Sequence, residues 1–361
     1  MLIIDRYIIK QFLLATLFAL IAFLLIFITI DLMENLDDFL DHNVGTHILL
    51  LYYLYFTPEM IILMLPVAML LSSLFTTGRL SNQNELIAIR MSGVSLYRLM
   101  VPFLTIALFI SLLSVYFNGW VVPKTNKEKL NIERQYLGKN LSTMTSSNLY
   151  FQDGPTRIVT IGFFDERYNT ASRISVQDYS DTNIVELLRR YDAQTMIWDS
   201  TNSVWILSNG IERTFHGLQQ TARPFNVLRL RSLTITPQRL ATMQEKPAEM
   251  SYSDLKQFVE HQEKSGNDVS RWLVDLYSKI SFPFANFIVV LFGVPFSSVK
   301  RRSGLAVEFG ISVAISFIYL AFMKASQVFG YNGALNPFIT AWLANGIFFI
   351  AGIAVIIRVQ K

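Results

Sequence analysis

The stretch SNQNELIAIRMSGVSLYRLM, residues 81–100, interrupts an apolar chain and thereby decides its fold. Residues 60–78 before it carry no charge, and residues 101–122 after it carry none. Arg79 stands just before the interruption, which itself contains Glu85, Arg90 and Arg98. A short charged stretch between two long apolar runs is typical of a loop that joins two membrane-spanning helices.

The composition of the whole chain agrees with a membrane protein. The 361 residues are 52% hydrophobic and only 16% charged, and the mean hydropathy is +0.37. The chain contains no cysteine, which excludes disulfides, thiolate metal sites and cysteine nucleophiles. Its net charge of +4 is small, and the sequence contains no nucleic-acid-binding signature.

Six stretches reach the length of about 20 apolar residues that a membrane-spanning helix needs. They are residues 10–30, 48–78, 99–122, 275–297, 303–324 and 337–357. The first exceeds the apolar region of a signal peptide, and the acidic sequence 31–41 after it offers no small-residue cleavage site. We therefore expect it to remain as the first span.

The distribution of lysine and arginine predicts the orientation of these spans. Basic residues gather at both ends of the chain and in two short loops: Arg6, Lys10, Arg79, Arg90, Arg98, Lys300, Arg301, Arg302, Arg358 and Lys361. The loops 31–47 and 325–336 contain none. Because basic loops stay in the cytoplasm, both termini are predicted to be cytoplasmic and residues 124–269 to lie outside.

Residues 124–269 are predicted to form an all-β domain, because 18 basic and 17 acidic residues make them polar and nearly neutral. Short β-branched runs separated by turn residues indicate a sandwich or jelly roll. The runs are RIVTIGFF (157–164), SRISVQDY (172–179), TMIWD (195–199), SVWILSNG (203–210) and FNVLRLRSLTIT (225–236). A short helix is predicted over 251–264, capped by Ser251 and Asp254. It leads into a second membrane part, residues 270–361, which has three spans like the first part, residues 1–123.

A short helix is predicted over residues 83–92 of the opening stretch. Asn82 and Glu85 have the spacing of a capping box, and Gly93 suits the left-handed residue that ends a helix. Two interpretations remain open at this level. The helix is either a connector whose arginines touch lipid headgroups, or a docking helix for a cytoplasmic partner with Glu85 exposed.

Ionisable residues within or near spans are costly and are therefore candidates for function. Arg271, Asp275 and Lys279 repeat at helical spacing, and Lys324 ends the fifth span. The three bases suit an anionic lipid headgroup, although a self-neutralising ladder and a lysine that snorkels to the interface are the plainer alternatives. Structural ion pairing explains Glu308, and for Glu59 it is as good an explanation as ligand binding.

No enzymatic site is visible in the sequence. The P-loop pattern G-x-x-x-x-G-K-[ST] is absent, and the four histidines fall in no zinc-binding spacing. We therefore expect no metal and no cofactor on this chain. A transport process would then draw its energy from another subunit.

Four motifs carry a resemblance to a known family: IDRYIIKQF (4–12), LPVAMLLSSLFTTGRLSNQNELIAIRMSGVS (65–95), WVVPKTNK (120–127) and FPFANFIVVLFGVPFS (282–297). Together with the order of three spans, a β domain and three spans, they resemble the LptF/LptG permeases of the lipopolysaccharide exporter. The DRY sequence at 5–7 slightly favours the LptG branch.

The resemblance implies a transmembrane permease of an ABC-type exporter in the bacterial inner membrane. The helix 83–92 would be the coupling helix that contacts an LptB ATPase dimer, and the ATP and Mg²⁺ would be held by that partner. The contacting residues would be Glu85, Leu86, Ile89, Arg90 and Gly93. A second half-permease would share a lipopolysaccharide cavity, with spans 1 and 5 as lateral gates. The periplasmic jelly roll would continue a bridge of LptC-type and LptA-type domains.

The sequence departs from the family at the outer end of the first span. Family members often carry a base there, but this chain has the acids Asp31, Glu34, Asp37 and Asp38. Either the partner supplies the phosphate contact, or the lipid differs, or the acidic stretch binds a divalent cation that bridges to phosphate. A structural role is the other explanation for Asp31 and Glu34. The resemblance leaves three other functions to weigh: an exporter of another lipid or of lipoproteins, a membrane scaffold without transport, and a secondary transporter.

Overall fold

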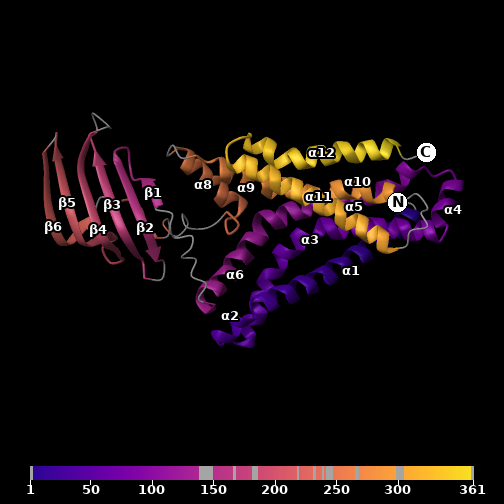
Figure 1. Cartoon of the computed structure of the whole chain (residues 1–361), viewed down its shortest axis with the longest axis horizontal. Coiled ribbons are helices and arrows are strands. Elements are labelled where there is room, and N and C mark those ends of the chain that lie inside the picture. Colours follow the sequence, from indigo (N-terminus) through magenta and orange to yellow (C-terminus); the bar gives the residue numbers. More distant parts are fainter. Residues whose placement is uncertain are drawn as a thin grey trace. The chain divides into compact units, whose positions relative to one another are not determined.

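A computed structural model describes residues 3–137, 149–165, 168–180, 186–217, 219–230, 233–237, 240, 247–264, 268–297 and 305–358. The chain divides into two compact units. One comprises residues 1–138, 247–260 and 268–361, and the other comprises 139–246 and 261–267. The first unit is helical and the second contains a β-sheet (Figure 1).

The helical unit contains long apolar helices joined by short segments (Figure 1). The helices of the chain are α1 (Ile3–Glu34), α2 (Leu36–Asp41), α3 (Thr46–Asn82), α4 (Glu85–Met91), α5 (Leu96–Tyr116), the π-helix η1 (Phe117–Val121), α6 (Val122–Tyr136), α8 (Tyr252–Lys264, whose last residues belong to the other unit), α9 (Ser270–Ser281), the 3₁₀ turn η3 (Phe282–Phe284), α10 (Ala285–Ser297), α11 (Leu305–Tyr331) and α12 (Pro337–Arg358). Among the described residues, six helical segments are long and apolar enough to cross a membrane. The predicted six-span helical protein is thus confirmed.

The core of this unit forms around α3 and α10. α3 packs against α1, α10 and α11, and most of the spans formed by α3 and by α9–α10 is buried, whereas only a small part of α1 is buried. Gly293 of α10 explains the close approach to α3, because a Cβ atom there would lie 1.8 Å from the Ser73 hydroxyl oxygen. Small residues at helix contacts allow such packing in membranes.

The third span continues as a helix beyond the predicted domain boundary at residue 124. α5, η1 and α6 follow one another without a break from Leu96 to Tyr136. Two contacts hold the extension against α3: Lys129 pairs with Glu59 at 3.1 Å, and the Tyr52 hydroxyl donates to Glu133 at 3.1 Å. These partners in α3 explain why a polar sequence that we assigned to the β domain belongs to the helical unit.

The fourth span is broken at Pro283, between α9 and α10. Proline has no backbone N–H, so the carbonyl four residues earlier, that of Lys279, loses its helical donor. The Asn118 side chain from the π-helix η1 donates to this carbonyl at 2.9 Å, and Asn345 of α12 donates to the Ser281 carbonyl at 2.7 Å. Side chains of neighbouring spans therefore satisfy the backbone groups that the break releases.

The second unit contains one antiparallel sheet of six strands in sequential order: β1 (Leu149–Gln152), β2 (Arg157–Asp165), β3 (Thr170–Tyr179), β4 (Leu187–Asp199), β5 (Val204–His216) and β6 (Gln219–Leu230). Trp205 lies fully buried in its core and donates its indole N–H to the Ile235 carbonyl at 2.7 Å. The predicted β domain is confirmed. The described strands form a meander, without the crossed connections of a two-sheet jelly roll.

The observed strands differ from the sequence-based ones in several details: β4 and β6 begin earlier than predicted, and β5 ends later. The strand β1 over 149–152 was missed, because four residues are too few to show alternation. The last strand ends at Leu230, short of the predicted residue 236. The helix α8 begins as predicted: the Asp254 amide donates to the Ser251 hydroxyl at 3.2 Å, and that hydroxyl donates to the Asp254 carboxylate at 2.6 Å.

Candidate functional site

The short helix α4 lies between the second and third spans, but it begins differently from the prediction. Asn82 is the last residue of α3, so it does not cap α4 as a partner of Glu85. The chain turns within two residues, with Asn84 in a left-handed conformation at φ 59°, which asparagine tolerates better than most residues. The end of the helix follows the prediction, since Gly93 has φ 87° and its amide donates to the Arg90 carbonyl at 3.0 Å.

The helix α4 has one face in the core and one face turned outward. Leu86 is buried and Ile89 packs partly against the same core cluster. On the other face, Ile87 is 48% exposed and Met91 is 85% exposed, and Arg90 is exposed beside them. An apolar pair next to a charged residue on a short, anchored helix is a surface suited to binding another protein.

Glu85 is not the fully exposed group that the docking interpretation expected. Its side chain is half-buried, and the Tyr7 hydroxyl of α1 donates to its Oε2 atom at 3.1 Å. The carboxylate keeps further acceptor positions, because an ionised carboxylate accepts about four hydrogen bonds. Glu85 is therefore held from one side while it remains able to accept a donor from another molecule.

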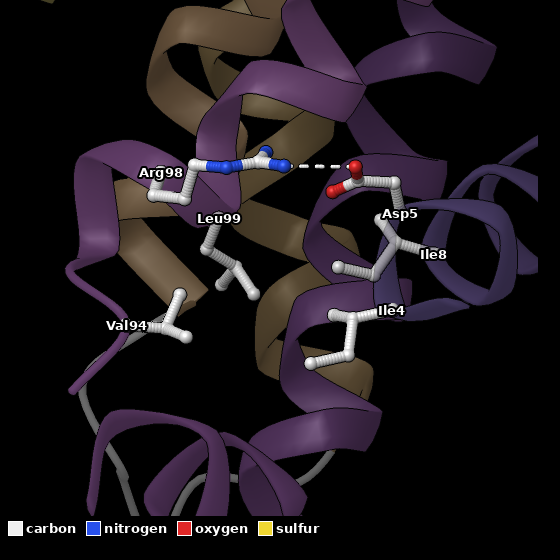
Figure 2. Close-up of a pocket in the computed structure, with 6 residues that line it drawn as sticks. All are labelled: Ile4, Asp5, Ile8, Val94, Arg98 and Leu99. Carbon is white, nitrogen blue, oxygen red and sulfur yellow. Dashed lines mark hydrogen bonds and ion pairs between the residues drawn. The ribbon is translucent and has the colours of Figure 1, made fainter. Parts of the chain in front are cut away.

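A second polar contact lies close by, at a small pocket lined by Ile4, Asp5, Ile8, Val94, Arg98 and Leu99 (Figure 2). The Arg98 guanidinium at the start of α5 donates to the Asp5 carboxylate at 2.8 Å. Asp5 is buried, with 9% of its surface exposed. The first turns of α1 thus touch both α4 and α5.

The three predicted bases gather around one acid in α9. Asp275 lies within electrostatic range of Arg271, Lys279 and Lys324. The Tyr331 hydroxyl of α11 donates to the Asp275 carboxylate at 2.5 Å, and the Arg271 guanidinium lies 5.4 Å from the centre of the Tyr331 ring. The structure therefore brings Lys324 of α11, more than 40 residues away in the sequence, to the two bases of α9, in a cluster of one acid and three cations.

The bases of this cluster differ in exposure. Arg271 and Lys324 are exposed, whereas Lys279 is half-buried, and within the described part of the chain it has no ion pair within 4.0 Å. Just before α9, hydrogen bonds from Ser270 lower the pKa of the Asp268 carboxyl and so favour its ionised form. The positive end of the helix dipole stabilises the same charge. The three bases and Asp275 together carry net positive charge, to which an anionic group can bind.

The predicted acids have other surroundings. Glu59 pairs with Lys129, whose ammonium also lies 5.5 Å from the centre of the Phe56 ring, so a structural role accounts for this residue. Asp31 is half-buried beside Tyr53, and Glu34 is exposed. No group of three or more histidines, cysteines or acids converges as a metal site among the described residues. The Glu308 side chain and the basic loop 300–302 lie outside the described residues.

Sequence reasoning missed Tyr7, Asp5 and Tyr331. Tyr7 and Glu85 are 78 residues apart, and no spacing rule connects them. Tyr7 and Asp5 belong to IDRYIIKQF, the first of the four motifs quoted above. This motif was the one signal in the sequence that these residues have a role besides packing.

Comparison with known proteins gives consistent results. The family model described as lipopolysaccharide export system permease LptF/LptG matches residues 6–358. The chain is 24% identical over 367 residues to the lipopolysaccharide export system permease protein LptG of Escherichia coli K12, covering 99% of this chain and 98% of that protein. It is 22% identical over 295 residues to LptG of Haemophilus influenzae, covering 75% and 77%. It is 21% identical over 354 residues to LptF of Escherichia coli K12, covering 96% and 92%.

Proposed function

Because this chain belongs to the LptF/LptG family of lipopolysaccharide export permeases, we propose that it is the transmembrane permease subunit of an ABC-type exporter. In this role it extracts lipopolysaccharide from the outer leaflet of the inner membrane and passes it to a periplasmic bridge. The chain is an inner-membrane protein with six apolar helices, and its similarity to LptG is slightly greater than its similarity to LptF.

The observation that carries this proposal is the outward face of α4. Ile87 and Met91 are exposed on a helix whose opposite face is anchored by Leu86 in the core. A rigid helix of this kind transmits a push from a bound protein to α3 and α5 at its two ends. The partner is an LptB-type ATPase dimer that holds ATP and Mg²⁺, and Glu85, Leu86, Ile89, Arg90 and Gly93 form or support the contact.

A second half-permease completes the transport path. Few residues of α1 are buried, and large apolar residues of α11 such as Phe317 and Ile318 are exposed. α3 packs against both helices, so α1 and α11 flank the same central span. These two helices are the proposed lateral gates, where the partner's spans meet them across the lipid cavity.

The basic cluster around Asp275 is the proposed contact for the lipid headgroup. Phosphate groups bind arginine and lysine through charge-assisted hydrogen bonds, and Arg271, Lys279 and Lys324 outnumber the one acid between them. Both chain termini and α4 are cytoplasmic in this proposal, and the β domain is periplasmic. Its edge strands β1 and β6 have one unpaired side each within the described sheet, and these sides suit strand addition by LptC-type and LptA-type domains.

Native mass spectrometry of the tagged chain, extracted gently from its own membrane, tests the assembly. We expect a complex with a related permease, two ATPase copies and a heterogeneous glycolipid. A phospholipid or lipoprotein adduct in place of the glycolipid would favour another ABC exporter, and a lone chain would favour a scaffold. In the same preparation, Glu85→Lys should reduce ATPase recovery about tenfold or more, because it removes a charge-assisted hydrogen bond and sets a cation against the cation of the partner. Gln83→Lys, at an exposed position, serves as the control.

Photo-crosslinking to lipopolysaccharide tests the basic cluster. We expect the double variant Lys279→Glu and Lys324→Glu to lower the yield severalfold, because the cluster then changes from net positive to net negative. Lys10→Glu, at an exposed position of α1, controls for general charge effects. An unchanged yield in the double variant would assign both lysines to membrane anchoring.

A further inference from the structure

The first turns of α1 are joined to both sides of the α4 loop by polar contacts. The Tyr7 hydroxyl donates to Glu85 at 3.1 Å to Oε2 and 3.4 Å to Oε1. The Arg98 guanidinium donates to Asp5 at 2.8 Å, and Figure 2 shows the two side chains pointing toward each other from α5 and α1. One end of α1 therefore contacts the helix before Gly93 and the helix after it.

Apolar packing reinforces these contacts. Ile8 and Phe12 of α1 are fully buried in the same cluster as Leu86 of α4 and Leu99 of α5. The rings of Phe12 and Phe103 meet edge to face, with centroids 5.2 Å apart. Because close-packed side chains transmit displacement with little give, the start of α1 must follow α4 and α5 when they move.

The rest of α1 is held much less firmly. All buried residues of this 32-residue helix lie between Asp5 and Ala19, and none follows Ala19. Near the end of α1, Leu32 still packs against the cluster that contains Phe39 and Tyr52. Because a helix is stiff over this length, a displacement at Asp5 and Tyr7 is passed along α1 to its less buried second part.

We propose that α4 moves α1 through two positioning residues: Tyr7, which links α1 directly to α4, and Asp5, which links α1 to the start of α5 just beyond α4. The inference rests on the proposed export function and deepens it: the first span responds to the docking helix through its own two side-chain links, in addition to the covalent route through α3 and α5. Tyr7 also orients Glu85, because a phenol donor fixes one side of the carboxylate and leaves the other for a cation of the bound ATPase.

The size of the effect follows from the exposure of the link. Tyr7 is 40% exposed, so water replaces part of a lost hydrogen bond. The removal of one hydrogen bond to a charged group in such a setting weakens a coupled equilibrium about three- to tenfold. Tyr97 offers a matched control: it is 42% exposed at the start of α5, and its hydroxyl makes no hydrogen bond to any described residue.

The test uses the whole exporter in proteoliposomes, with its ATPase and its related permease, and measures lipopolysaccharide transferred per ATP hydrolysed. We expect Tyr7→Phe to lower this ratio about three- to tenfold and Tyr97→Phe to leave it unchanged. A destabilised complex would lower transfer and hydrolysis together and keep the ratio, so the ratio separates coupling from stability. An unchanged ratio in Tyr7→Phe overturns the inference and leaves the export function standing. If the wild-type exporter transfers no lipopolysaccharide, both this inference and the proposed export function are refuted.

A charge exchange tests the second link with the same assay. Asp5→Arg and Arg98→Asp should each lower the ratio, and the two together should recover most of it, because the pair is then restored with its charges reversed. A double variant no better than the poorer single variant contradicts the pairing. Recovery in the double variant would indicate direct contact between Asp5 and Arg98, because two independent structural losses would add.

Discussion

The polar chain that closes the break in the fourth span supports a quantitative prediction. Asn345 donates to the Ser281 carbonyl at 2.7 Å and accepts from the Tyr319 hydroxyl at 2.5 Å. All three residues are at most 4% exposed. The change Asn345→Leu keeps an apolar side chain of similar size but removes both hydrogen bonds, and it leaves one carbonyl and one hydroxyl without their partner.

The cost follows from measured hydrogen bonds between membrane helices, which contribute about 0.6 kcal/mol on average and about 1.7 kcal/mol at most. Two such bonds give a loss of about 1–3 kcal/mol in the free energy of unfolding. Water cannot replace the lost donor at a site so thoroughly buried, so solvent does not reduce this loss of free energy.

The assay is reversible unfolding of the purified permease in mixed micelles by titration with a denaturing detergent, followed by tryptophan fluorescence. Ser111→Ala is the control, since the Ser111 hydroxyl is buried with no hydrogen-bond partner among the described residues. Its removal should change the free energy of unfolding by less than about 0.5 kcal/mol. Equal stabilities of the two variants would refute the account of how the break at Pro283 is stabilised.

Two further predictions concern packing in each unit. Gly293→Ala should destabilise the helical unit by about 1–3 kcal/mol, because the new Cβ meets Ser73. Gly346→Ala, with nothing within 4 Å of the new Cβ, should stabilise the unit slightly. The same detergent titration compares the two variants, and a tolerated Gly293→Ala would contradict the close approach of α3 and α10. Trp205→Phe should lower the stability of the β unit by about 1–3 kcal/mol, since the Ile235 carbonyl loses its donor. Thermal unfolding with limited proteolysis measures this, and equal protease resistance would speak against it.

Much of the architecture was predictable because it depends on local properties of the sequence. The length of an apolar run decides whether a helix spans a membrane, and the runs around residues 81–100 gave the second and third spans. Alternating β-branched residues predicted β2 and β3 almost to their ends. Gly93 ends α4 as expected, because the left-handed conformation is a property of that single residue.

Two other predictions were wrong. The capping box of Asn82 and Glu85 does not form, because α3 continues through Asn82. The β domain was assigned to begin at residue 124, but Glu59 and Tyr52 of α3 hold α6 as a continuation of the third span. The second error treats a polar sequence as a boundary, although a polar sequence with partners across a helix contact is part of the packed unit.

The sequence by itself determined the six spans, the inserted β domain and the types of residue at the candidate sites, since each follows from composition and periodicity over a few turns. Only the tertiary structure decided which of those residues meet. It joined Tyr7 to Glu85 and set three bases around Asp275. The physical reason is that such contacts depend on which helix faces pack together, and the packing of large apolar surfaces elsewhere in each helix fixes that choice.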